Sequence, residues 1–112
     1  MSEPLHVDSA NFEKEVLQAS TPTVVDFYAV WCAPCRMMGP VFESLAREYQ
    51  GRVKFVKVDV DRAPDLANRY QVRGVPTLAI FSQGRLVDTI VGLAPPEAIR
   101  QAVESLAAPR AN

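Results

Sequence analysis

Two cysteines separated by two residues are the groups best suited to chemistry in this 112-residue sequence. Cys32 and Cys35 lie in the run Trp31-Cys32-Ala33-Pro34-Cys35, directly after an apolar stretch. Three residues in a first helical turn would place the two Cα atoms about 5 Å apart, which is within the range for a disulfide. A loop this small removes little chain entropy, about 2 kcal/mol, so the bond would be a poor structural staple. The spacing therefore predicts a disulfide that is made and broken.

The expected start of a helix predicts which cysteine reacts first. Pro34 suits the first helical turn, because its missing N–H leaves no intrahelical bond unmade. The free amides of that turn put positive potential near Cys32 and favour its thiolate, which is the nucleophile in disulfide exchange. We therefore expect Cys32 to attack a substrate disulfide and Cys35 to resolve the mixed disulfide, which leaves the pair oxidised.

Asp26 is the best candidate to accept the proton that Cys35 must lose. It precedes Cys32 in a strand that we predict to be buried, where desolvation should raise its pKa towards neutrality. Lys57, in the strand expected alongside, could be its partner. Alternatively, Asp26 is a buried acid satisfied by that lysine, or Lys57 is a charge at a strand edge. The only histidine, His6, is predicted to lie at the surface without a role.

The elements that must position these residues alternate between strand and helix patterns. The run 23–29 is nearly continuous apolar and β-branched, which is typical of a central strand covered on both faces. Two later strand patterns flank a short turn containing Gly84, which indicates a hairpin. The predicted elements are, in order, a helix near 12–17 capped by Asp8 and Ser9, the strand 23–29, a long helix from the cysteines to Gly51 with a kink at Pro40, a strand 53–60, a helix around 66–70, the strands 77–81 and 86–91, and a last helix opened by Pro95 and Pro96.

These patterns predict an α/β fold with a single domain over residues 1–112. Because strands and helices alternate in the first half of the chain, the strands there should be parallel. The central sheet should therefore be mixed, with parallel strands and an antiparallel C-terminal hairpin, and flanked by about four helices. Residues 107–112 should form a frayed tail.

The composition excludes several classes of partner. Twelve basic and thirteen acidic residues, with no run of like charge, offer no footprint for nucleic acid or for an anionic membrane. The most apolar stretch, 24–30, is far shorter than the roughly 20 residues that a membrane helix needs. The N-terminus lacks secretory features, so we expect a cytoplasmic protein. A single cysteine pair without paired histidines leaves too few ligands for zinc, so we expect no metal.

Several motifs together resemble the thioredoxin family, from about residue 24 to residue 106. They are Val25-Asp26-Phe27, Trp31-Cys32-Ala33-Pro34-Cys35, Pro40, Lys57-Val58-Asp59, Arg73-Gly74-Val75-Pro76-Thr77 and Gly84. The resemblance implies the thioredoxin fold and a general protein-disulfide reductase that acts on disulfide-containing proteins. It also implies that no cofactor is bound, and that an NADPH-dependent thioredoxin reductase reduces the pair again. We expect a monomer.

The resemblance also implies the residues that surround the cysteines. Pro76 would be a cis proline facing the pair, and Asp26 with Lys57 would match the buried proton-transfer pair of the family. The residues implied to bind substrate are Trp31, Gly74, Val75, Pro76 and Gly92. Two positions depart from the family pattern: Ala33 replaces a glycine, and Tyr28 stands where many members carry a second tryptophan. Ala33 puts the redox potential in question, because a methyl group restricts the backbone between the two sulfurs.

The sequence alone also allows other interpretations of the same residues. A disulfide oxidase or isomerase would use the same cysteines, but it needs an oxidising compartment and an unstable disulfide. A binding module would use the groove around Trp31, Val75 and Gly92, with the cysteines incidental. The cysteines could also be unreactive core residues. Pro76 could be an ordinary loop proline, since only about one X–Pro bond in twenty is cis in folded proteins.

Overall fold

The apolar run predicted as a buried strand lies at the centre of the fold. The computed structural model describes residues 3–107, in which the elements are β1 Leu5–His6, η1 Glu13–Leu17, β2 Thr23–Tyr28, α1 Ala33–Glu48, β3 Lys54–Asp59, α2 Pro64–Arg69, β4 Thr77–Ser82, β5 Arg85–Val91 and α3 Pro96–Glu104. The five strands of this part of the chain form one sheet in the order β1-β3-β2-β4-β5. β3 pairs in parallel with β1 and β2, whereas β4 runs antiparallel to both β2 and β5. The predicted mixed sheet with an antiparallel hairpin is confirmed.

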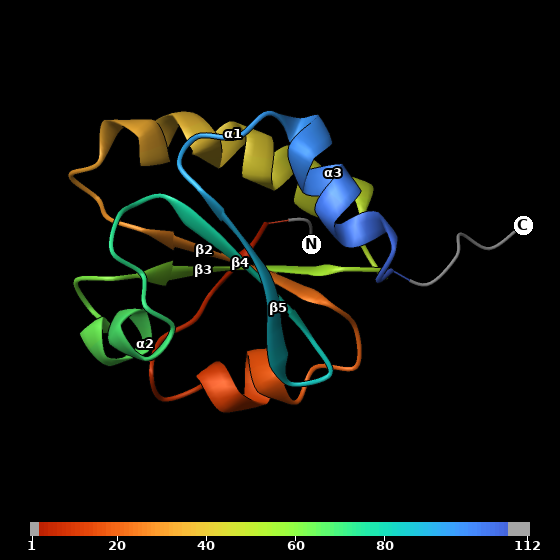
Figure 1. Ribbon diagram of the computed structural model, residues 1–112, viewed down its shortest axis with the longest axis horizontal. Helices are drawn as coiled ribbons and strands as arrows, with labels where there is room; N and C mark the ends of the chain where they lie inside the picture. The colour runs from red at the N-terminus through yellow and green to blue at the C-terminus, as the bar shows by residue number, and fades with distance from the viewer. Residues whose placement is uncertain (1–2, 108–112) are drawn as a thin grey trace, which may run out of the picture.

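Helices cover both faces of this sheet. Figure 1 shows α1 and α3 on one face and α2 on the other, where η1 also lies. Because side chains alternate along a strand, Val24 of β2 packs with residues of α1 and α3, while Val25 and Phe27 pack on the η1 and α2 side. Asp26 has the same parity as Val24. It therefore lies on the α1 face, in a strand that is buried from Thr23 to Phe27.

The N-terminal elements differ from the predictions. The sequence pattern does not predict β1, because two exposed residues are too short to show a period, and the strand exists only through its pairing with β3. The predicted helix cap at Asp8 and Ser9 is wrong, because Phe12 is the N-cap residue and no side chain caps this helix. The Asp8 carboxylate accepts the N–H of Ala10 over 2.9 Å in a turn, and η1, a single π-helical turn, begins only at Glu13. His6 consequently lies on the sheet, in register with Lys57.

The last helix closes the α1 face of the core. Ile99 and Val103 of α3 are fully buried. Tyr49, just after α1, donates its hydroxyl to Glu104 over 2.6 Å and so ties the two helices together. Ala107 donates its N–H to the carbonyl of Val103 over 3.0 Å. The rest of the predicted frayed tail, 108–112, lies outside the described residues.

The turn between β4 and β5 depends on a glycine. Gln83 and Gly84 have φ angles of +54° and +79°, the positive values of a two-residue type I′ hairpin turn. A Cβ on Gly84 would lie 3.1 Å from the carbonyl oxygen of Leu17. We expect Gly84→Ala to lower the free energy of unfolding in urea by about 1–2 kcal/mol. Gly39→Ala is the matched control, because its added Cβ meets nothing within 4 Å, and equal losses in the two variants would contradict this account.

Candidate active site

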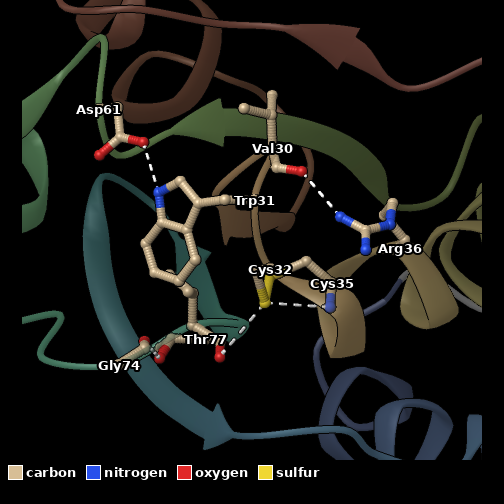
Figure 2. The surroundings of a disulfide bond; sticks show 9 residues. Val30, Trp31, Cys32, Cys35, Arg36, Asp61, Gly74 and Thr77 are labelled. Atoms are coloured by element: carbon tan, nitrogen blue, oxygen red, sulfur yellow. Dashed lines mark hydrogen bonds between the residues drawn. A yellow bond between two sulfur atoms is a disulfide. The ribbon is translucent and has the colours of Figure 1, made fainter.

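The cysteine pair opens helix α1. Cys32 is the N-cap residue, and Ala33 and Pro34 occupy the first helical positions. The two cysteines are joined in a disulfide with their Cα atoms 5.2 Å apart, which agrees with the predicted spacing. The backbone N–H of Cys35 donates to Sγ of Cys32 over 3.2 Å, as Figure 2 shows. In the reduced protein this amide and the positive end of the helix would stabilise a thiolate on Cys32.

The loop before β4 faces the sulfur of Cys32. The Val75–Pro76 peptide bond is cis, as the resemblance implies. Sγ of Cys32 lies 3.7 Å from the carbonyl oxygen of Val75. The carbonyl of Gly74 accepts a hydrogen bond of 2.7 Å from the side-chain hydroxyl of the residue that begins β4. Gly92, with a φ of +90°, donates its N–H to the carbonyl of Pro76 over 2.8 Å, so the predicted groove residues of the two loops lie together.

Trp31 lies on the surface next to the cysteines, with 67% of its area exposed. Its indole Nε1–H donates to Asp61 over 2.8 Å, and Arg36 of α1 donates to the carbonyl of Val30 over 2.9 Å, so this loop is held from both sides (Figure 2). A cavity of about 170 Å³ beside the indole is lined by Trp31, Val60, Val72, Arg73, Gly74 and Val75. Its mainly apolar walls can receive one side chain of an extended peptide.

Asp61 is a site residue that the sequence interpretation misses. The signal was its position shortly after β3, because parallel strands end at the same edge of a sheet and β2 leads there into the cysteine loop. Thirty residues separate Trp31 from Asp61 in the chain. Only the parallel pairing of β2 with β3 brings them together.

Asp26 is fully buried in β2, in register with Lys57 on β3 and with Leu78 on β4. Neither of its carboxylate oxygens has a hydrogen-bond partner among residues 3–107. Burial raises the pKa of Asp26 to about 6, and the charge of Lys57 opposes part of that rise. The environment predicted for this residue, a buried acid beside a lysine, is therefore present. Such a carboxyl can take up a proton and release it near neutral pH.

Residues 3–107 contain neither a cluster of metal-ligating side chains nor a helix that could span a membrane. No three or more His, Cys, Asp or Glu side chains within residues 3–107 gather in a way that could hold a metal ion. The helices of the same range are too short or too polar to cross a membrane. Both cysteines of the sequence are engaged in the one disulfide.

The disulfide lies at the start of a helix and closes a loop too small to be a strong structural cross-link, an arrangement that suits thiol–disulfide exchange. The protein is a thiol–disulfide oxidoreductase with a redox-active cysteine pair. Residues 3–105 match the family model described as Thioredoxin, and the chain belongs to the thioredoxin family. The resemblance seen in the motifs is thus confirmed and extends over nearly all of the described residues.

Two thioredoxins and one solved structure support this placement over most of the chain. Thioredoxin 1 of Nostoc sp. strain PCC 7120 is 43% identical over 104 residues, which cover 93% of this chain and 97% of that protein. Thioredoxin 1 of Synechococcus elongatus is 48% identical over 95 residues, which cover 85% and 89%. A solved structure of a mutant thioredoxin from Halobacterium salinarum NRC-1 matches with a TM-score of 0.86 at 37% identity, covering 98% of this chain and 96% of that one. The predicted fold is therefore confirmed.

Proposed function

We propose that this protein is a general protein-disulfide reductase that cycles between dithiol and disulfide at Cys32 and Cys35. The observation that carries the proposal is the place of Cys32 at the start of α1, where its Sγ accepts a hydrogen bond from the amide of Cys35. Membership of the thioredoxin family implies disulfide-containing proteins as substrates. The rest of the proposal assigns a role to each residue around the pair.

The reaction runs through a mixed disulfide with the substrate. The Cys32 thiolate attacks one sulfur of a substrate disulfide, and the other substrate sulfur leaves as a thiolate that takes a proton from solvent. Cys35, once deprotonated, attacks the Cys32 sulfur and releases the second substrate sulfur, which is protonated in turn. The Cys32–Cys35 bond closes, and two electrons have passed to the substrate.

Asp26 is assigned as the acceptor of the Cys35 proton, directly or through one water. It lies on the face of the sheet covered by α1, the helix that carries Cys35. With a pKa of about 6 its carboxylate is ionised at neutral pH and can accept that proton. Lys57, its register partner, favours this ionised form by its positive charge.

An Asp26→Ala variant should resolve mixed disulfides about 100-fold more slowly, at the lower end of the range for general base catalysis. The loss should be greatest above pH 6, where Asp26 is ionised, and should fade near the ordinary thiol pKa of about 8.5, where Cys35 can ionise unaided. The measurement is single-turnover release of a substrate thiol over that pH range. A rate profile identical to that of the wild type would remove Asp26 from the mechanism.

The substrate is proposed to bind across Trp31 and the cis-proline loop. Gly74 and Val75 offer backbone next to Cys32, Pro76 sets the shape of the loop, and Gly92 forms the opposite wall through its contact with Pro76. The small cavity beside Trp31 would hold one substrate side chain. A groove built mainly from backbone and apolar surface suits substrates of varied sequence, which is what a general reductase needs.

We assign re-reduction of the pair to an NADPH-dependent thioredoxin reductase, so that no cofactor binds to this chain. The protein would act as a monomer in the cytoplasm. The test is insulin reduction coupled to NADPH oxidation with a bacterial thioredoxin reductase. NADPH should be consumed only when both proteins are present. Acceleration of insulin reduction over dithiothreitol alone, without NADPH consumption, would contradict the reductase assignment alone, and no acceleration in either assay would contradict the proposed function.

The direction of electron flow can be measured separately. The pair should equilibrate with a glutathione buffer at a potential near or below that of the cytosolic pool, because a pair much more oxidising than that pool could not keep protein disulfides reduced. A pair far more oxidising than that pool would indicate an oxidase or isomerase instead. The comparison of wild type with Ala33→Gly would show how far the methyl group between the cysteines shifts this equilibrium.

A further inference from the structure

A row of polar residues crosses three parallel strands and leads to Asp26. In the strand register His6 of β1 is opposite Lys57 of β3, and Lys57 is opposite Asp26 of β2. Register partners share one face of a sheet, and Tyr28, two residues after Asp26, lies on that face too. The row therefore runs from an exposed histidine at the sheet edge to a fully buried acid.

The side chain of Tyr28 contacts two members of this row, Lys57 and His6. The Lys57 ammonium lies 4.5 Å from the centroid of the ring, a cation–π geometry. The Tyr28 hydroxyl is 3.4 Å from Nδ1 of His6, and the two rings meet edge to face with centroids 6.2 Å apart. Tyr28 also packs against the buried cluster that contains both cysteines.

The space around Lys57 explains why such a contact matters. A cavity of about 490 Å³ is lined by His6, Val7, Asp8, Tyr28, Val30, Lys57, Asp59 and Arg62. Asp8 and Asp59 place two further carboxyl groups on the wall of this cavity, and Arg62 adds a second cation. A flexible lysine side chain has room in this cavity to turn away from Asp26, towards the other carboxyl groups.

We propose that the ring of Tyr28 is a positioning group that holds the Lys57 ammonium beside Asp26, while His6 packs against the ring from the sheet edge. The ring favours the ammonium by its negative face, and the ammonium in turn favours the carboxylate form of Asp26. Tyr28 thus acts through Lys57 and touches neither substrate nor reacting sulfur in this role. The effect on turnover rests on the proposed function of Asp26, but the positioning itself does not.

The test follows the titration of the Asp26 carboxyl by ¹³C NMR in the oxidised protein. Tyr28→Leu should raise the pKa of Asp26 by about half a unit, whereas Tyr28→Phe, which keeps the ring, should leave it unchanged. Tyr70→Leu is the matched control, because it removes another partly buried ring on the opposite face of the sheet. An unchanged pKa in Tyr28→Leu, or equal shifts in the Phe and Leu variants, would overturn the proposal.

A second comparison separates positioning from simple burial. Lys57→Met should itself raise the pKa of Asp26, because Lys57 lowers it. In that background Tyr28→Leu should cause no further rise, since the ring then has no ammonium to hold. A full additional shift in the double variant would show that Tyr28 acts on Asp26 without Lys57, and the inference would be wrong.

The wild-type protein offers a readout that needs no variant. The ε-methylene protons of Lys57 should be shifted upfield by the Tyr28 ring relative to those of Lys14, and equal shifts would contradict the contact.

If the Asp26 titration moves as expected while Asp26→Ala leaves resolution unaffected, the positioning holds and the proposed proton transfer fails. The opposite pattern would retain the proton transfer and overturn the role of Tyr28.

Discussion

A Cys35→Ser variant should accumulate as a stable mixed disulfide with its substrate and lose turnover by at least about 100-fold. The Cys32 thiolate remains, with the helix start that favours it, so the first step proceeds. The serine hydroxyl cannot displace a sulfur under these conditions, so the second step stops. The measurement is a non-reducing gel with a disulfide substrate. It should show a covalent adduct at one substrate per chain that dithiothreitol releases.

Cys32→Ser is the matched control for this result, because both cysteines are equally buried, at 4% exposure each. Burial therefore does not distinguish the two sulfurs, and the proposed order of attack rests on the position of Cys32 at the helix start. The control should neither trap substrate nor turn over. Trapping of equal extent through Cys35 would reverse the assigned order, and turnover retained in Cys35→Ser would favour a binding module in which the cysteines are incidental.

The central part of the fold can be predicted from local patterns. Around Val24 and Val25 the side chains on both faces of the strand are apolar, a pattern typical of a strand that is covered on both faces. That strand lies at the centre of the sheet. The Gln83–Gly84 pair predicts a tight hairpin, because a two-residue turn needs positive φ angles and glycine adopts them without strain. These signals lie within a few residues of one another, so no tertiary information is required.

The N-terminal strand β1 cannot be predicted from local sequence patterns. Leu5 and His6 are both exposed and carry no period, and their strand is specified only by pairing with Val56 and Lys57, some fifty residues later. The same gap explains why the sequence assigns His6 no place near the site. Register across three strands, which puts it in line with Asp26, is a property of the assembled sheet.

In the candidate site, too, some features follow from local sequence and others depend on the assembled fold. The spacing of Cys32 and Cys35 predicts a disulfide without any reference to the rest of the chain. The cis bond before Pro76 follows only from the resemblance, because most such bonds are trans. The hydrogen bond from Trp31 to Asp61 follows from neither, because it depends on where two parallel strands end.

The second large effect expected concerns stability, and Asp26 is its source. Burial raises the pKa of this carboxyl from 3.8 to about 6, so the folded protein binds its proton more tightly than the unfolded chain does. The associated stability is fully present below pH 3.8 and is lost as the pH rises through about 6. The loss is on the order of 3 kcal/mol. An Asp26→Ala variant should lack this loss, so its stability relative to wild type should rise by that amount from acid to neutral pH.

Urea denaturation of the oxidised proteins at several pH values measures this difference directly. The cavity left by the alanine destabilises the protein equally at every pH, so the change with pH isolates the ionisation of Asp26. Glu15→Gln is a control of opposite sign, because Lys54 holds the pKa of Glu15 below its usual range and the stability it contributes is present above that range. Parallel pH curves for wild type and Asp26→Ala would mean that the carboxyl is not desolvated. It would then lack the raised pKa on which its proposed role as proton acceptor for Cys35 depends, so the same measurement bears on fold and mechanism together.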